Sequence, residues 1–195
     1  MKSDRRVTYT KMVLKKSLLE IIQEKPVSRI TVKEICEKAD INRATFYSHF
    51  KDVNDMMTQI ENELYDTIKH TLDKGWRANS LSELLTGVCT DLKLNEDVCK
   101  AILSDNGDKD FLNRALFVAQ EKCVSDWQTT APKADVETLE KIYTFFSYGS
   151  AAIVLSWVRS GMEESPKEIA SFIEQITNKG LGLLGDNSPN SRTNK

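Results

Sequence analysis

The sequence predicts an all-α protein made of a three-helix N-terminal unit and a larger C-terminal helical bundle. Glycine and proline are sparse, at 8 and 4 of 195 residues, and no stretch shows the apolar–polar alternation of a half-buried strand. Apolar residues instead recur every three or four positions, which is the spacing of one buried helix face. Three of these runs begin with Ser or Thr followed three residues later by Glu, a pattern typical of helix starts.

The N-terminal unit starts with a polar stretch at residues 1–10 that carries Lys2, Arg5 and Arg6. We expect this stretch to be a flexible basic arm able to neutralise phosphates, or a disordered terminus. The first helix is predicted from about residue 10 to residue 24, with an apolar stripe on one side. It should end there because the next two residues are Lys-Pro, and proline disfavours helical geometry in the residue before it.

Residues 31–51 read as two short helices with a tight joint. Thr31 and Glu34 form a capping box at the start of the first helix, and the Asn42 side chain can cap the second. Phe46 and Phe50 share the inner face of the second helix. The side chains left mostly outward are Arg43, Thr45, Tyr47, Ser48 and His49. This is the helix-turn-helix plan, although the spacing alone also fits an ordinary corner between two helices.

The rest of the chain predicts six further helices. Their expected ranges are about 54–74, 80–92, 97–103, 108–129, 135–160 and 166–180. Ser80 with Glu83, Asp108, and Ser165 with Glu168 are the expected N-terminal caps, and Pro132 separates two of the helices. Glycine at position 161 should end one helix, and the glycines at positions 180, 182 and 185 should end the last. A small-residue patch at 149–152 would let another helix approach closely.

These patterns predict an N-terminal arm and helix-turn-helix unit at residues 1–53, a helical regulatory and dimerisation domain at 54–185, and a disordered tail at 186–195. Charge is divided the same way. Residues 1–52 hold 12 Lys and Arg against 7 Asp and Glu, whereas the remainder holds 15 against 22. The basic end is expected to meet a polyanion, although a surplus of five charges also fits a solvated face.

Several classes of protein are disfavoured. No apolar run approaches the length of a membrane span, and the polar N-terminus is unlike a secretory signal, so we expect a cytoplasmic location without membrane contact. The four cysteines show no C-x-x-C pair and read as small buried residues. With His49 and His70 as the two histidines, we expect no metal site and no cofactor. No nucleophile–base pair or phosphate-cradling glycine loop supports an enzyme.

The motifs T-x-x-E-I-x-x-x-A and T-F-Y-x-H-F-K make the N-terminal third similar to the TetR/AcrR family of bacterial repressors. The resemblance is close from about Tyr9 to Met57, and the C-terminal part resembles the family in architecture and in Trp157–Phe172. It implies a cytoplasmic bacterial repressor that binds a palindromic double-stranded DNA operator. It also implies a homodimer through helices 135–160 and 166–180, each subunit placing helix 42–49 in a major groove.

The resemblance also implies residue roles on the DNA. Thr31, Tyr47 and Lys51 match positions that hold backbone phosphates, and His49 should lie close to the backbone. The positions that read base edges in the family are Arg43, Ala44, Thr45 and Ser48, next to the capping Asn42. Thr31 also fits a role as a cap alone. The chain departs from the family pattern at Asp40, where glycine is frequent, and at Val53, where a second lysine is frequent.

Family members usually release DNA when a small molecule enters the helical body, so a small-molecule effector is expected. Candidate pocket residues are Met57, Tyr65, Trp76, Phe111, Phe117, Trp127, Tyr143 and Tyr148. An aromatic residue at helical spacing is also typical of plain core. The alternative is a DNA-bound co-regulator controlled by a protein partner, and an enclosed apolar cavity in the body would favour the small molecule. The sequence does not identify the effector.

Overall fold

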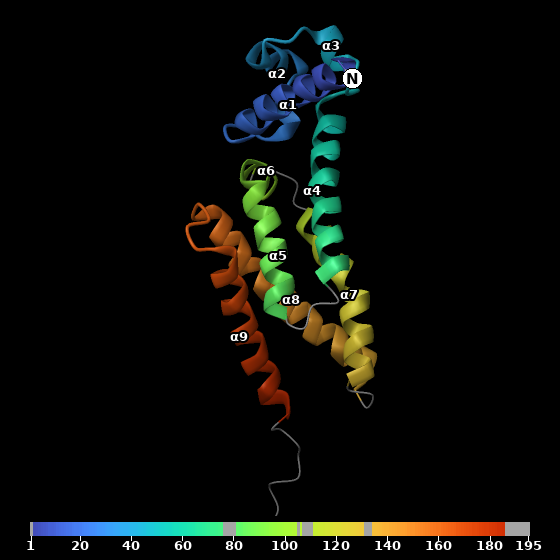
Figure 1. The fold of residues 1–195 in the computed structure, drawn as a ribbon, viewed down its shortest axis with the longest axis vertical. Coiled ribbons are helices and arrows are strands. Elements are labelled where there is room, and N and C mark those ends of the chain that lie inside the picture. The colour runs from blue at the N-terminus through green and yellow to red at the C-terminus, as the bar shows by residue number, and fades with distance from the viewer. Residues whose placement is uncertain (1, 76–80, 105, 107–110, 131–133, 186–195) are drawn as a thin grey trace, which may run out of the picture. The chain divides into compact units, whose positions relative to one another are not determined.

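The structure is a computed structural model that describes every residue except 1, 76–80, 105, 107–110, 131–133 and 186–195 (Figure 1). Among the described residues all regular structure is helical, which confirms the predicted fold class. The elements are α1 (Lys2–Ile22), η1 (Val27–Arg29), α2 (Val32–Ala39), α3 (Arg43–Tyr47), α4 (Val53–Gly75), α5 (Leu81–Leu94), α6 (Glu96–Ile102), α7 (Phe111–Thr130), α8 (Val136–Arg159) and α9 (Pro166–Gly185). None of these helices, within the residues described, could cross a membrane.

The chain forms two compact units. Unit 1 consists of Met1–His70 and Leu94–Val118, and unit 2 consists of Thr71–Lys93 and Ala119–Lys195. Unit 1 therefore holds the helix-turn-helix together with most of α4, all of α6 and the first turns of α7. The functional boundary expected after residue 53 stays a prediction, because a compact unit and a DNA-binding domain need not share their limits.

The core of unit 1 is built where α1, α2 and α3 meet. Leu14, Leu18 and Ile22 on α1 are fully buried, as are Ile35 on α2 and Phe46 on α3. These residues repeat every three or four positions on α1, so one side of that helix faces the core as the sequence predicted. A fully buried aromatic ring at Phe46 fixes the rotation of α3 about its own axis, which decides the side chains that α3 turns outward.

Two helices are longer than the sequence predicted. The stretch expected to be an arm is helical, because α1 begins at Lys2 and continues without interruption to Ile22. Nothing in residues 2–9 breaks a helix, since they include neither proline nor glycine. At the other end, α9 does not end at Gly180 but continues to Gly185. A glycine inside a helix costs only about 1 kcal/mol relative to alanine, so it weakens a helix without stopping it.

In unit 2 the reversal from α8 to α9 is tied by several hydrogen bonds. Gly161 and Met162 have positive φ values of 92° and 54°. The Met162 N–H donates to the Trp157 carbonyl (2.9 Å) and the Gly161 N–H to the Val158 carbonyl (3.2 Å), which is a Schellman ending. The Trp157 indole N–H donates to the Glu164 carbonyl at 3.0 Å. The predicted glycine stop at position 161 is confirmed.

Two helix starts in unit 2, those of α8 and α9, agree with the prediction. Ser165 and Glu168 form a capping box at α9, with the Ser165 N–H donating to Glu168 Oε2 at 2.7 Å. Asp135 caps α8 by accepting from the Thr138 N–H at 2.8 Å. The predicted caps Ser80 and Asp108, and Pro132 between two helices, lie outside the described residues.

The cysteines are free thiols. Cys36, Cys89 and Cys99 are buried, as predicted for small apolar residues, whereas Cys123 is half-buried beside a cluster of Val124, Leu139 and Tyr143. Burial raises the pKa of the Cys89 thiol to about 11 and that of the Cys99 thiol to about 12. Both thiols are therefore neutral and poorly nucleophilic near neutral pH.

Candidate nucleic-acid interface

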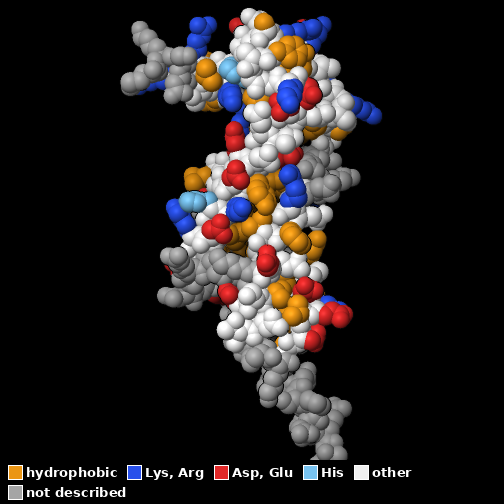
Figure 2. All heavy atoms as spheres, turned by 90° about the vertical axis from the view of Figure 1, so that its right-hand side faces the viewer, with side chains coloured by type: hydrophobic (Ala, Val, Ile, Leu, Met, Phe, Trp, Pro, Cys, Tyr) orange, Lys and Arg blue, Asp and Glu red, His pale blue; other side chains and the backbone are white. Residues whose placement is uncertain are grey.

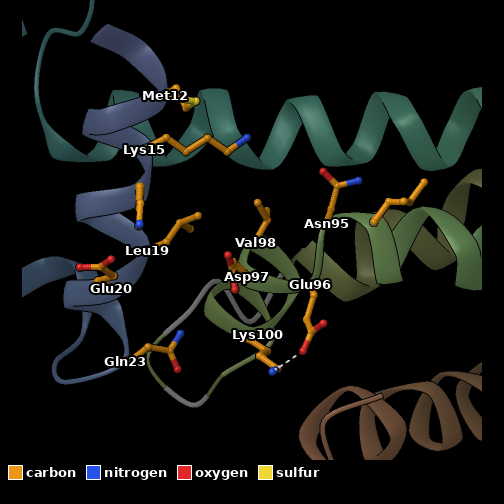
Figure 3. A pocket seen from close by; sticks show the side chains of 12 residues that line it. Met12, Lys15, Leu19, Glu20, Gln23, Asn95, Glu96, Asp97, Val98 and Lys100 are labelled. Carbon is orange, nitrogen blue, oxygen red and sulfur yellow. Dashed lines mark hydrogen bonds and ion pairs between the residues drawn. The ribbon is translucent and has the colours of Figure 1, made fainter. Parts of the chain in front are cut away.

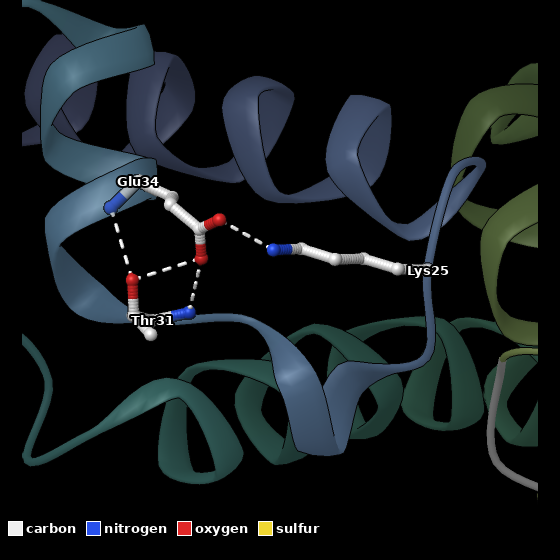
Figure 4. A network of polar contacts seen from close by, with 3 residues as sticks. All are labelled: Lys25, Thr31 and Glu34. Atoms are coloured by element: carbon white, nitrogen blue, oxygen red, sulfur yellow. Dashed lines mark hydrogen bonds and ion pairs between the residues drawn. The ribbon is translucent and has the colours of Figure 1, made fainter.

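The predicted capping box at the start of α2 is present (Figure 4). The Glu34 N–H donates to Thr31 Oγ1 at 3.3 Å, and the Thr31 N–H donates to Glu34 Oε2 at 2.9 Å. The Thr31 hydroxyl also donates to Glu34 Oε2, at 2.8 Å. The ammonium group of Lys25 forms an ion pair with the other oxygen, Glu34 Oε1. A single carboxylate therefore joins the loop after α1 to the first turn of α2.

These contacts stabilise the ionised form of Glu34. The hydrogen bond from Lys25 is the largest cause, followed by those from Thr31, and together they lower the pKa of Glu34 from 4.5 to about 2. Glu34 is therefore fully ionised near neutral pH. Both donors of Thr31 that were expected to face a phosphate, its hydroxyl and its N–H, point at this carboxylate. The phosphate contact of Thr31 stays a prediction, and it would require Glu34 to give up these hydrogen bonds.

The joint between α2 and α3 depends on Asp40, which adopts a left-handed conformation with φ 54° and ψ 43°. The Ile41 N–H donates to the Cys36 carbonyl (3.0 Å) and the Asp40 N–H to the Glu37 carbonyl (3.4 Å), so α2 ends in a Schellman motif. Glycine is the usual residue at this position, but aspartate is one of the few others that adopt the conformation. Asp40 therefore permits the turn where glycine is frequent in the family.

Helix α3 is short, is capped by Asn42 and packs through its buried side. Asn42 Oδ1 accepts from the Thr45 N–H at 2.8 Å and from the Thr45 hydroxyl at 3.1 Å. Phe46 and Phe50 are buried with ring centroids 5.5 Å apart. The helix was expected over 42–49, and its regular part is Arg43–Tyr47. Its orientation is nevertheless well fixed, because both ends and the inner face have defined contacts.

The other side of this segment carries the polar residues predicted to meet DNA. Asn42, Arg43, Ala44, Tyr47, Ser48 and Lys51 are exposed, and Thr45 and His49 are half-buried. The Ser48 hydroxyl donates to the Thr45 carbonyl at 2.7 Å, and the Thr45 hydroxyl donates to Asn42. In this arrangement Thr45 and Ser48 offer acceptor lone pairs outward, which suit the amino groups of cytosine or adenine. Arg43 offers donors, which suit guanine O6 and N7.

The start of α4 differs from the family pattern in the way the sequence indicated. Val53, the first residue of α4, has an uncharged side chain that is buried, so no cation lies where a second lysine is frequent in the family. The Lys51 N–H donates to Asp55 Oδ2 and the Asp55 N–H donates to Asp52 Oδ1, both at 2.8 Å. The hydrogen bond from the Lys51 backbone lowers the pKa of Asp55. Two carboxylates therefore lie beside Lys51, and they reduce the positive potential of this corner.

The eight candidate pocket residues are spread over both units. In unit 1, Met57 and Phe111 are buried, Tyr65 is half-buried, and Phe117 is 72% exposed. In unit 2, Tyr143 is buried with its ring 6.3 Å from that of the half-buried Trp127, and Tyr148 is 50% exposed. Trp76 lies outside the described residues. The structure thus brings Trp127 and Tyr143 together, whereas Phe117 and Tyr148 have their rings at the surface of the chain.

A groove that the sequence did not indicate lies within unit 1 between α1 and α6 (Figure 3). Its volume is about 730 Å³. Its lining is Met12, Lys15, Lys16, Leu19, Glu20, Gln23, Leu94, Asn95, Glu96, Asp97, Val98 and Lys100, and none of the eight candidates contributes. Four of its charged residues form ion pairs in the chain: Lys15 with Glu63, Glu20 with Lys38, and Lys100 with Glu96, which both line the groove. Met12 and Leu94 in this lining are well exposed.

A helix-turn-helix whose second helix turns polar side chains outward, joined to a larger helical body, defines a DNA-binding transcriptional regulator. Comparison of the chain with known protein families gives the same class of protein. Residues 16–60 match the family described as "Bacterial regulatory proteins, tetR family", and residues 79–179 match the one described as "Transcriptional regulator C-terminal region". The chain belongs to the tetR family of DNA-binding transcriptional regulators, which are not enzymes. The resemblance inferred from the sequence is confirmed.

Individual relatives agree with this assignment. The chain is 36% identical over 69 residues to YxbF of Bacillus subtilis (strain 168), an uncharacterized HTH-type transcriptional regulator, and the match covers 34% of the chain but 18% of that protein. A TetR transcriptional regulator from Streptococcus agalactiae 2603V has a similar structure, with a TM-score of 0.62 at 20% identity over 91% of this chain and 98% of that one. The transcriptional regulator FadR from Bacillus subtilis, in complex with stearoyl-CoA, has a TM-score of 0.58 at 14% identity, over 85% of this chain and 96% of that one. The two structures show a shared fold.

Proposed function

We propose that the protein is a repressor that binds a palindromic operator as a homodimer and leaves it when a small-molecule effector binds. The observation that carries the DNA-binding part is the fixed orientation of α3. Phe46 is fully buried, so Arg43, Tyr47 and Ser48 are turned outward together. Arg43 and Ser48 would then read base edges, while Tyr47 and Lys51 would hold phosphates and set the register of α3 in the major groove.

Exposed aromatic residues on α8 and α9 support the proposed dimer. Phe145 is 75% exposed and Phe172 is 53% exposed. Apolar patches of this kind on a single chain mark interaction surfaces. On α8, Gly149 follows Phe145 by about one helical turn; it is exposed, and a Cβ atom there would meet nothing within 4 Å. A second copy could therefore approach α8 closely at this point while it covers the aromatic rings.

A two-fold dimer would match a palindromic operator, because the two α3 helices would meet equivalent half-sites one helical turn apart or a multiple of it. The effector part rests on the family and on one relative of the same fold, FadR, whose structure contains stearoyl-CoA. That relative supports a small molecule over a protein partner as the controlling signal. In the alternative, the protein is a co-regulator whose acidic body binds a protein partner. An excess of a small molecule would then leave DNA binding unchanged.

The deciding experiment is gel retardation with a pool of genomic DNA fragments at several salt concentrations. The wild-type protein should select a palindromic site, and the logarithm of its affinity should fall steeply with the logarithm of salt concentration. Tyr47→Ala and Lys51→Ala should weaken binding to all sequences, and Arg43→Ala should relax the preference at one base position. Failure to retard any fragment at low salt would refute the proposal. An unchanged preference in Arg43→Ala would refute the base-reading role of that residue.

A further inference from the structure

The first two turns of α1, residues 2–9, extend from unit 1 as an N-terminal extension. The described side chains of this extension, from Arg5 to Tyr9, are all exposed, and Tyr9 is 63% exposed. None of these side chains is buried, although Val7, at 38% exposed, is partly covered, so these turns bury little. Turns that bury so little contribute little to the stability of the fold, because helices in proteins are stabilised mainly by packing of one face.

The charges of the extension also do little for the helix that carries them. The amino end of a helix is electrostatically positive, so cations there are unfavourable and anions are favourable. Arg5 nevertheless falls in the first turn of α1, and Arg6 follows directly. An external anion close to this helix end would reverse the unfavourable effect. The arrangement of charge therefore favours an anionic partner over a contact within the chain.

The extension starts at the DNA-binding surface. Further along α1, the ammonium group of Lys11 lies 5.7 Å from the centroid of the Phe50 ring, so α1 passes the joint between α3 and α4 next to Lys51. Arg5 precedes Lys11 by six residues, or about 9 Å of helix. In the view of Figure 1 the N-terminal end of α1 and helix α3 lie at the same end of unit 1, and Lys and Arg side chains are exposed over this end in Figure 2.

We propose that the N-terminal extension is a second phosphate-binding segment, in which Arg5 and Arg6 contact the DNA backbone beside the half-site read by α3. This inference rests on the proposed function. It explains how the DNA-binding surface can work with the buried Val53 where a second lysine is frequent and with two carboxylates beside Lys51. Guanidinium groups suit phosphate oxygens because they donate in a bidentate geometry. The exposed Tyr9 hydroxyl adds a further donor on the same turns.

DNA fits this segment better than an acidic protein does, because a duplex presents one negative charge for about every 1.7 Å of its axis. Two adjacent arginines on a helix can therefore both find phosphates without a matching pattern of carboxylates. The contacts would carry no sequence information, so they would raise the affinity for operator and non-operator DNA alike. A helical extension would also hold the guanidinium groups in place before binding, which a flexible arm would not do.

The test compares the salt dependence of DNA binding for the wild-type chain, Arg5→Ala/Arg6→Ala and the matched control Lys69→Ala/Lys74→Ala. The control removes two exposed cations near the far end of α4. For a dimer with four such contacts, the slope of log affinity against log salt should fall by about 3.6 in the arginine variant. The slope should not change in the control. Circular dichroism should show all three proteins equally folded.

A further variant, Val7→Pro, keeps both arginines but breaks the helix within the extension. It should lose part of the slope if the arginines are presented by a helix, and a slope equal to wild type would overturn the helical presentation. A wild-type slope in the double arginine variant would overturn the whole inference. Absence of DNA binding by the wild-type chain itself would instead refute the proposed function, so the two failures are distinguishable.

Discussion

Replacement of Thr31 by alanine tests the stability that the capping box gives to the DNA-binding unit. Alanine lacks the oxygen that accepts the Glu34 N–H and the hydroxyl that donates to Glu34 Oε2. Loss of an N-cap of this kind costs about 1 kcal/mol, within a range of about 0.5–2. We expect the free energy of unfolding to fall by that amount in urea denaturation followed by far-ultraviolet circular dichroism. Thr31→Ser, which keeps the hydroxyl, is the matched control.

Equal stability of Thr31→Ala and Thr31→Ser would refute the role of the cap. The acidic partner allows a second check through pH. The pKa of Glu34 is lowered to about 2 in the folded protein, so its charge stabilises the fold above its unfolded pKa, near 4.5. That contribution is lost as the pH falls from about 4.5 to about 2.

Glu34→Gln keeps a capping side chain without the charge, because glutamine also serves at this position of a capping box. Its stability should therefore differ most from wild type above about pH 5, and the difference should vanish by about pH 2. The measurement is the free energy of unfolding of both proteins across this range. A difference that stays constant from about pH 5 to about pH 2 would show that the ion pair with Lys25 and the Thr31 hydrogen bonds do not act through the charge of Glu34.

Four further variants test the fold and the proposed dimer. Asp40→Gly should raise the free energy of unfolding by about 0.5–1 kcal/mol, because glycine adopts the left-handed conformation without steric cost; an unchanged or lower value in urea denaturation would contradict this. Phe46→Ala should lower it by about 3–5 kcal/mol through loss of a fully buried ring, whereas Tyr47→Ala next to it should stay within about 0.5 kcal/mol. The double variant Phe145→Asp/Phe172→Asp should sediment as a monomer at micromolar concentration, where the wild type should sediment as a dimer. If the wild type and the variant had the same oligomeric state, the proposed interface would be refuted.

Local features of the fold could be predicted because their causes lie within a few residues of one another. The capping box at Thr31 is one case, since its partner is three residues away. The turn at Asp40 and the stop at Gly161 are others, because each depends on the conformation open to one residue. By contrast, the helical start of α1 was missed because an exposed helix has no apolar stripe to reveal it. The continuation of α9 past Gly180 was missed because glycine was read as a stop rather than as a small energetic cost.

The candidate site was predictable to the extent that it depends on α3 alone. Periodicity around Phe46 and Phe50 separated the inner from the outer side correctly. The contact of Glu34 with Lys25 was out of reach, because Lys25 lies in a loop whose path depends on the packing of α1 against α2. The aromatic residues in the body show the same limit. Helical spacing does not say which neighbour covers a ring, so Phe117 and Tyr143 looked alike in sequence but differ in exposure.

The division into two units has a practical consequence for following how the protein unfolds. All three tryptophans of the chain, at positions 76, 127 and 157, fall outside the residue ranges of unit 1. Trp157 is buried with its indole N–H bonded to a carbonyl, so its emission should shift to longer wavelength when unit 2 opens. Tryptophan fluorescence therefore reports on unit 2 alone, while circular dichroism averages over both. A change in unit 1 such as Thr31→Ala will separate the two signals if the units unfold independently, and will move them together if they unfold as one.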